Sequence, residues 1–221
     1  MFGDYFYNQT LRKMTIAFGQ IFNDIIVQTK DANDSVVKRS FVATGGTVLA
    51  SKLALDSKLA CNTAGGSHHA NFEEGAGYCV FNDVAVAAQY LLDRGLASRI
   101  LIVDLDVHQG NGNADIFKEN KNVFTFSMHS KSNYPAKKSI SDLDVALEDN
   151  IEDKQYIEIL KSHLSKLNDK KFDFVFYIAG VDIHFNDRLG KLKISDEGIR
   201  QRDELVTENF FSKNFIISKV A

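Results

Sequence analysis

The residues best suited to chemistry lie at 100–108, which reads Ile-Leu-Ile-Val-Asp-Leu-Asp-Val-His and in which four aliphatic residues lead into two aspartates and a histidine. An apolar run of this kind predicts a strand that is buried on both faces of a parallel sheet. In extended backbone Asp104, Asp106 and His108 would share one side of the chain, because side chains repeat every two residues. Gathering two carboxylates and an imidazole costs free energy unless a cation neutralises them, so the pattern predicts a divalent-metal site.

A second apolar run, at 172–179, ends at Gly180-Val181-Asp182 and supplies a third candidate ligand. Three protein ligands leave one coordination position open for water, which is typical of catalytic rather than structural zinc sites. A metal in such a site lowers the pKa of its water toward about 7. The competing interpretation is that these acidic residues only cap the segments that follow the two strands.

The stretch Gly65-Gly66-Ser67-His68-His69 is a glycine-rich loop that could bring both imidazoles to one cavity. A histidine beside a metal-activated water can act as its general base. On its own, however, a histidine pair is more typical of a surface loop. The cysteines, Cys61 and Cys79, have neither CxxC nor zinc-finger spacing, which predicts reduced thiols in a cytoplasmic protein.

Four stretches over about residues 45–205 together resemble the zinc-dependent histone deacetylase family, which shares the arginase-type α/β fold. They read GGSHHANFEEGAGYCVFNDVAVAA, ILIVDLDVHQGNG, VFTFSMH and YIAGVDIHFNDRLGKLKIS. The D-x-H-Q-G-x-G loop is most similar to the bacterial and class IV-like branch. An arginase-type two-metal site would instead require acidic residues at Gly110 and His184, so the sequence favours one catalytic metal.

The resemblance implies a role for each matching residue. It assigns Asp106, His108 and Asp182 as the zinc ligands, with Fe²⁺ as the alternative metal. It assigns His68 and His69 as the pair that handles protons around the attacking water. It makes Asp104 the partner of the first histidine and Asn111 the partner of the second, where many members carry Asp. It places Asp104 and Ser127 beside a monovalent cation such as K⁺. The walls of the acyl-lysine channel would be Gly77, Tyr78, Tyr134 and Leu189.

The elements that must position these residues alternate along the chain. Helices are predicted at 46–58, from Asn82-Asp83 to Arg94, at 154–167 and after Ser195. Strands are predicted at 59–63, 99–104, 123–128, 172–179 and 215–218, with a long loop at 130–150. This alternation predicts a three-layer α-β-α fold with a mostly parallel sheet, in which ligands bind beyond the carboxyl ends of the strands. We expect residues 1–221 to form a single, partial deacetylase-like domain, incomplete at both termini.

Composition narrows the class of protein. The chain has 221 residues, a net charge of −3 and 44% hydrophobic residues, so it has no general basic field for nucleic acid. No segment reaches the roughly 20 apolar residues that a membrane span requires, so no membrane partner is expected. Residues 1–20 lack the pattern of a secretion signal, which again predicts a cytoplasmic protein.

The predicted activity is metal-dependent hydrolysis of the acetyl amide of acetyl-lysine in a protein, or of an acetylated small amine. The family carries a Gly-Gly-Tyr-like stretch whose tyrosine polarises the acyl carbonyl, and the present sequence ends at Ala221 without it. An oxyanion donor of that kind contributes about 10²–10³ in rate. The alternative is therefore a catalytically impaired remnant or a non-catalytic interaction module. A variant of this alternative has the missing parts supplied by a separate polypeptide. The partners expected for the chain are therefore a polypeptide that completes the fold or, as the alternative, other copies in a homo-oligomer.

Overall fold

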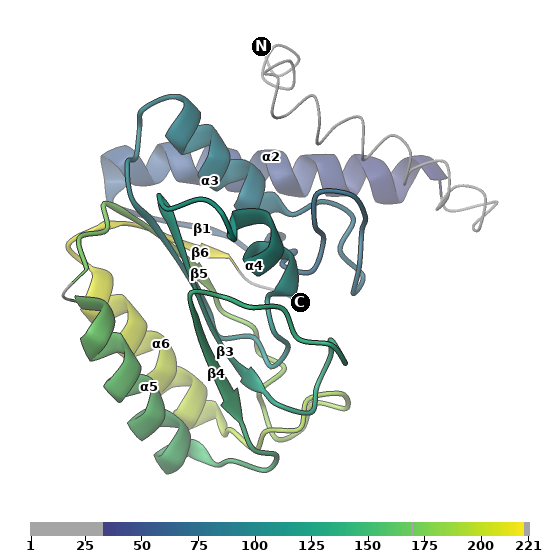
Figure 1. Cartoon of the computed structure of the whole chain (residues 1–221), viewed down its shortest axis with the longest axis vertical. Helices are drawn as coiled ribbons and strands as arrows, with labels where there is room; N and C mark the ends of the chain where they lie inside the picture. Colours follow the sequence, from purple (N-terminus) through teal and green to yellow (C-terminus); the bar gives the residue numbers. More distant parts are fainter. Residues whose placement is uncertain (1–32, 169, 219–221) are drawn as a thin grey trace.

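The computed structural model describes residues 33–168 and 170–218, and its centre is a six-stranded sheet (Figure 1). The strand order is β1-β6-β5-β2-β3-β4, and every neighbouring pair is parallel. The strands are β1 (Leu59–Asn62), β2 (Ile100–Asp104), β3 (Val123–Ser130), β4 (Leu143–Leu147), β5 (Phe174–Ile178) and β6 (Asn214–Ser218).

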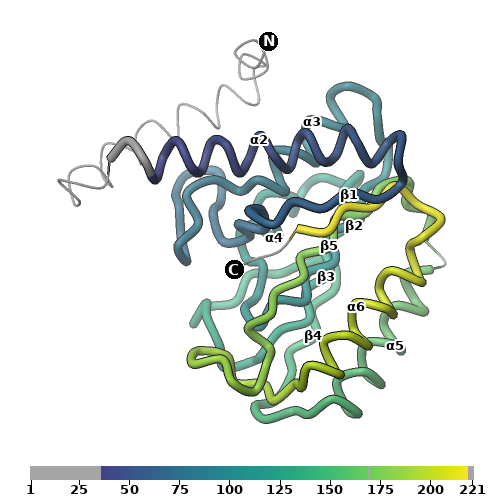
Figure 2. The backbone as a smooth tube through the Cα atoms, turned by 180° about the vertical axis from the view of Figure 1, so that it is seen from behind, coloured from purple at the N-terminus to yellow at the C-terminus, as the bar shows by residue number. Residues whose placement is uncertain are grey.

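Helices cover both faces of this sheet (Figure 1). One layer contains α2 (Asn33–Ser57), α3 (Asp83–Asp93) and α4 (Asn111–Phe117), and the other contains α5 (Asp153–Asn168) and α6 (Asp196–Phe210). Figure 2 shows α2 running along the side of the sheet that β1 and β6 form. The predicted three-layer α-β-α fold with a parallel sheet is confirmed.

Alternation along the central strands explains the three layers. In β2, Leu101 and Val103 join the core under α5 and α6, whereas Ile100 and Ile102 join the core under α2, α3 and α4. All five residues of β2 are buried, and so are all five of β5. Central strands that are covered on both faces must be apolar throughout, which is why these two were readable as continuous hydrophobic runs.

The predicted helix caps are also present. The side chain of Asn82 accepts a hydrogen bond from the backbone N–H of Ala85 at the start of α3, and Ser195 accepts one from Gly198 at the start of α6. Gly95, just after α3, has a φ of 64°. These residues satisfy backbone groups that the helix ends would otherwise leave unpaired.

Three predictions of local structure were wrong. Helix α2 begins at Asn33 rather than at residue 46, and its weak amphipathicity hid the first turns. The predicted loop at 130–150 contains β4, an edge strand that pairs only with β3 and in which half-buried and exposed residues alternate. The strand predicted at 99–104 does end at Asp104, but the extended backbone expected through Asp106 and His108 is absent, because the chain bends after Asp104. Among the described residues, no helix combines the length and apolar character needed to cross a bilayer.

The carboxyl ends of β2, β3 and β5 meet at one edge of the sheet. Asp104, the last residue of β2, is paired in register with Ser127 of β3 and with Ile178 of β5. The segments that carry the candidate ligands leave the sheet at this edge. The fold therefore places the candidate site where open α/β sheets bind their ligands.

Candidate metal centre

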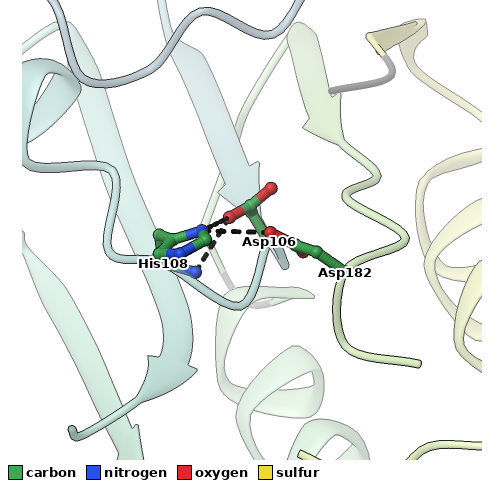
Figure 3. Close-up of side chains that lie close together, drawn as sticks. All are labelled: Asp106, His108 and Asp182. Carbon is green, nitrogen blue, oxygen red and sulfur yellow. Dashed lines mark hydrogen bonds and ion pairs between the residues drawn. The ribbon is translucent and has the colours of Figure 1, made fainter. Parts of the chain in front are cut away.

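Asp106, His108 and Asp182 converge beyond the ends of β2 and β5 (Figure 3). One ligand atom from each residue lies within 4.8 Å of the others. His108 Nδ1 is 3.0 Å from Asp106 Oδ1 and 3.0 Å from Asp182 Oδ2. Two carboxylate oxygens and one imidazole nitrogen thus surround a single point.

This convergence comes from a bent loop and not from the extended alternation that the sequence predicted. The backbone N–H of Asp106 donates to Asp104 Oδ1 at 3.2 Å, and that of His108 donates to Asp106 Oδ1 at 2.8 Å. The N–H of Val107 donates to Asp182 Oδ1 at 3.0 Å and so joins the loop after β2 to the loop after β5. Backbone donors therefore aim the carboxylates that the site requires.

The residues present fit a divalent cation. Asp106 Oδ2 is buried and has no hydrogen-bond partner, which is costly for a carboxylate unless a cation is bound. A Cβ at Gly180 would lie 2.7 Å from Asp106 Cα, so glycine leaves the space that this carboxylate occupies. The mixed oxygen and nitrogen donor set suits zinc and also ferrous iron.

The electrostatics of the three side chains agree with this fit. Burial lowers the pKa of His108, but hydrogen bonds and attraction to Asp106 and Asp182 outweigh burial and raise it to about 10. Burial, together with the neighbouring charge of Asp106, raises the pKa of Asp182. These shifts mean that the two carboxylates favour a positive charge beside them, because they repel each other without one.

The histidine pair lies beside this cluster. The rings of His68 and His69 are 4.0 Å apart between centroids, and the ring of His69 is 5.8 Å from that of His108. His68 Nδ1 is 2.6 Å from Asp104 Oδ2, and His68 Nε2 is 3.7 Å from Asp106 Oδ1. His69 Nδ1 is 2.7 Å from Asn111 Oδ1.

Different partners give the two histidines opposite protonation preferences. Burial lowers the pKa of His68, but the charges of Asp104 and Asp106 outweigh it and raise the value to about 9. Burial lowers the pKa of His69 to about 3, and the neighbouring positive charge of His68 adds to that effect. The amide of Asn111 offers a hydrogen bond but no full negative charge, so it does not reverse the shift.

The loop before the histidines is held by Asp83 at the start of α3. Its carboxylate accepts hydrogen bonds from the backbone N–H of Gly66 at 3.0 Å and of Ser67 at 2.7 Å, and from Thr47 Oγ1 at 2.5 Å. The sequence predicted Asp83 only as part of a helix cap. Its role in aiming the loop depends on the packing of α2 and α3 and has no signal in the local sequence.

Of the four predicted channel residues, two contact the second histidine. A Cβ at Gly77 would lie 2.7 Å from His69 Cγ, and the ring of Tyr134 meets that of His69 edge-on at 4.8 Å between centroids. Tyr78 and Leu189 have exposed side chains, at 103% and 67% of their full area. Gly77 and Tyr134 therefore flank the site, whereas Tyr78 and Leu189 lie at the surface of their loops.

Two amide side chains that the sequence reasoning missed hold the loop that carries Tyr134. Gln109 Nε2 donates to Asp144 Oδ1 at 2.8 Å, and Gln109 Oε1 accepts from the N–H of Ser139 at 2.8 Å. Asn133 Nδ2 donates to the carbonyl of Leu189 at 2.8 Å, and Asn133 Oδ1 accepts from the N–H of Lys191 at 3.1 Å. The sequence marks Gln109 only as part of the D-x-H-Q-G-x-G loop, and its burial and partners are visible only in the structure.

The two residues predicted beside a monovalent cation are neighbours across β2 and β3. Asp104 and Ser127 are aligned in register, and Ser127 Oγ lies 3.0 Å from His129 Nδ1 and 3.5 Å from the N of Gly110. Asp104 also binds His68 through Oδ2. The structure brings this pair together next to the three candidate ligands.

Comparison with known proteins agrees with this geometry. Residues 7–217 match the family model described as the histone deacetylase domain. The chain is 50% identical over 186 residues to an uncharacterized protein of Picosynechococcus, covering 84% of the chain and 62% of that protein. It is 37% identical to histone deacetylase 2 of Arabidopsis thaliana, covering 77% of the chain and 45% of that protein.

Solved structures show the same likeness. A crystal structure of a histone deacetylase homologue complexed with SAHA superposes with a TM-score of 0.76 at 27% identity, covering 82% of this chain and 52% of that one. A homologue from Aquifex aeolicus gives a TM-score of 0.74 at 26% identity, covering 81% and 52%. The chain thus spans between 45% and 62% of the length of these relatives. The family model covers residues 7–217, and this match shows that the chain belongs to the histone deacetylase family.

Proposed function

We propose that this chain is a divalent-metal-dependent deacetylase that hydrolyses the acetyl amide of acetyl-lysine in proteins or of a similar acetylated amine. The observation that carries the proposal is the convergence of Asp106, His108 and Asp182 beside two histidines of opposite protonation preference. Zinc is the proposed metal, with ferrous iron as the alternative. The free cysteines support a cytoplasmic location.

The proposed chemistry divides the work between the metal and the histidines. A bound divalent metal supplies Lewis acidity, which activates water and polarises the acyl carbonyl. His69 Nδ1 is bonded to Asn111 Oδ1, so its Nε2 is the ring nitrogen that would accept the proton of the attacking water. His68 is protonated and held by Asp104, so it stabilises negative charge that develops nearby.

Residues beside the proposed metal site are candidates for contacts with the acyl chain and with a monovalent cation. Gly77 and Tyr134 flank His69 and would line the path of the acyl chain. Asp104 and Ser127 would hold a monovalent cation such as K⁺, which would add positive charge beside the carboxylate that bonds to His68. Substrates in both size classes, an acetyl-lysine peptide and a free acetylated amine, fit this chemistry.

The test measures metal content and turnover on the full chain. We expect about one zinc or iron per chain and release of acetate from an acetyl-lysine peptide or an acetylated polyamine. Asp182→Ala should lose both properties, whereas Asp56→Ala, at an exposed position of α2, should keep both. A folded chain that binds no divalent metal would contradict the proposal. Metal binding without turnover of either substrate would favour the interaction module instead.

A further inference from the structure

The largest side chain that is completely buried in the described part of the protein is Arg202, in the middle of α6. It occupies the apolar stripe of that helix, in line with Gly198, Val206 and Phe210. A leucine or methionine at this position would fill the core without the cost of burying a charge. The guanidinium therefore calls for an explanation in terms of what it binds.

Arg202 binds the backbone of both segments that carry candidate metal ligands. Its Nη1 donates to the carbonyl of Gly180 at 2.5 Å and to the carbonyl of Leu105 at 3.4 Å. The Leu105 carbonyl belongs to the peptide bond that leads into Asp106. The Gly180 carbonyl lies in the segment that leads into Asp182. One nitrogen of one side chain thus joins the loop after β2 to the loop after β5.

The guanidinium is itself held in place from the opposite direction. Its Nε donates to Asp203 Oδ1 at 2.8 Å, and the same oxygen accepts a hydrogen bond from Tyr177 Oη at 2.5 Å. The guanidinium carbon lies 5.8 Å from the centroid of the Tyr177 ring. Tyr177 belongs to β5, the strand that ends just before Gly180. Contacts with Asp203 and Tyr177 therefore hold the guanidinium in place, in addition to its bonds with the two carbonyls.

We propose that Arg202 is a positioning residue for the metal centre. By binding the Leu105 and Gly180 carbonyls together, it sets the spacing between Asp106 on one loop and Asp182 on the other. At the ligands these loops are joined by the bond from Val107 N–H to Asp182 Oδ1 and by the contact of His108 Nδ1 with Asp182 Oδ2, and both contacts use a ligand carboxylate. Arg202 supplies a link from behind the site that leaves the ligand oxygens free. This inference rests on the proposed metal site.

The experiment compares the full chain with three variants. Zinc affinity is measured by competition with a chromophoric chelator, and the visible spectrum is recorded for the Co²⁺-loaded proteins. Arg202→Met keeps an unbranched apolar stem but removes the donors, and Arg202→Lys keeps the charge with a different donor geometry. The matched control is Arg200→Met, on the same helix two residues earlier, where the arginine is exposed and pairs with Glu197 and Glu204. Thermal unfolding with chelator present reports the stability of each metal-free chain.

We expect Arg202→Met to bind zinc about 10–100-fold more weakly than the parent, as is typical when groups that orient metal ligands are removed. Its Co²⁺ spectrum should lose intensity or shift, because the ligand geometry changes. Arg202→Lys should recover part of this loss, and Arg200→Met should match the parent. Should Arg202→Met fail to fold, Asp203→Asn replaces it. That variant weakens the hold on the guanidinium Nε and should lower zinc affinity by a smaller factor.

The inference would be overturned if Arg202→Lys and one further variant, either Arg202→Met or Asp203→Asn, kept the zinc affinity and the Co²⁺ spectrum of the parent. This conclusion would hold even if those variants unfolded at a lower temperature. Failure of the parent chain itself to bind zinc or Co²⁺ would contradict the proposed function instead. The two failures are thus distinguished by the behaviour of the parent.

Discussion

His68 Nδ1 and Asp104 Oδ2 lie 2.6 Å apart, and both side chains are almost completely buried. The pair joins the glycine-rich loop to the end of β2, and it lies next to the carboxylate of Asp106. A buried carboxylate at this distance stabilises the imidazolium form. The protonation of His68 is therefore part of what holds the metal-free site together.

The first prediction concerns the pH dependence of stability in the presence of a chelator. The pKa of His68 is about 9 in the folded chain and 6.5 ordinarily, so its contribution is complete below pH 6.5 and is lost as pH rises through 9. His108, with a folded pKa of about 10, acts in the same direction. We expect the free energy of unfolding in urea to fall by about 1–3 kcal/mol between pH 6.5 and pH 9. Asp104→Asn should show a smaller fall, and an equal fall in that variant would contradict the assignment to this pair.

The second prediction concerns the partner of the other histidine. In the parent chain, His69 Nδ1 lies 2.7 Å from the amide oxygen of Asn111. Asn111→Asp replaces this amide with a carboxylate. Because an adjacent negative charge favours the imidazolium, the pKa of His69 should rise from about 3 by about 1–3 units. Titration by NMR in the presence of chelator measures this shift. Asn122→Asp, at an exposed position before β3, should leave the titration of His69 unchanged.

The third prediction concerns Gly180. A Cβ there would lie 2.7 Å from Asp106 Cα and would collide with Asp106 Oδ2. Gly180→Ala should therefore lose metal binding and destabilise the chain by about 1–3 kcal/mol. The matched control is Gly45→Ala in α2, where an added Cβ meets nothing within 4 Å. It should stabilise the chain by about 0.5–1 kcal/mol, because alanine favours helix over glycine. Chemical denaturation and metal titration check both variants.

The fourth prediction concerns the loop that carries Tyr134. Asn133→Ala leaves the carbonyl of Leu189 and the N–H of Lys191 without their partners, so it should cost about 1–3 kcal/mol of stability. Loosening the loop should also raise KM for an acetylated substrate more than it lowers kcat, since the chemistry at the ligands is untouched. An unchanged KM in a folded variant would show that this loop does not contact substrate.

The fifth prediction concerns the two cysteines. Burial raises the pKa of Cys79 to about 11, whereas Cys61 lies exposed on β1. Because the thiolate is the reactive form, iodoacetamide at pH 8 should alkylate Cys61 first and Cys79 only slowly. Mass spectrometry of timed digests measures the two rates. Equal rates would indicate that the segment around Cys79 opens readily in solution.

Much of the fold was readable from the sequence because its central strands carry strong local signals. The runs at 100–104 and 174–178 are apolar throughout, since helices cover both of their faces. Strand β4 and the first turns of α2 were missed for the opposite reason. Both lie at the margin of the fold, where half-exposed positions mix polar and apolar residues and blur the periodicity.

By itself, the sequence determined which residue types follow each strand, and parallel strands must bring those residues to one edge. That was enough to nominate Asp106, His108 and Asp182. Only the tertiary structure decided how they converge, because the loop bends after Asp104 and the aiming donors are backbone N–H groups. It also decided the roles of Asp83 and Arg202. Arg202 binds a carbonyl 97 positions away in the chain, and no local pattern encodes a contact between such distant residues. Packing of helices on the sheet creates it.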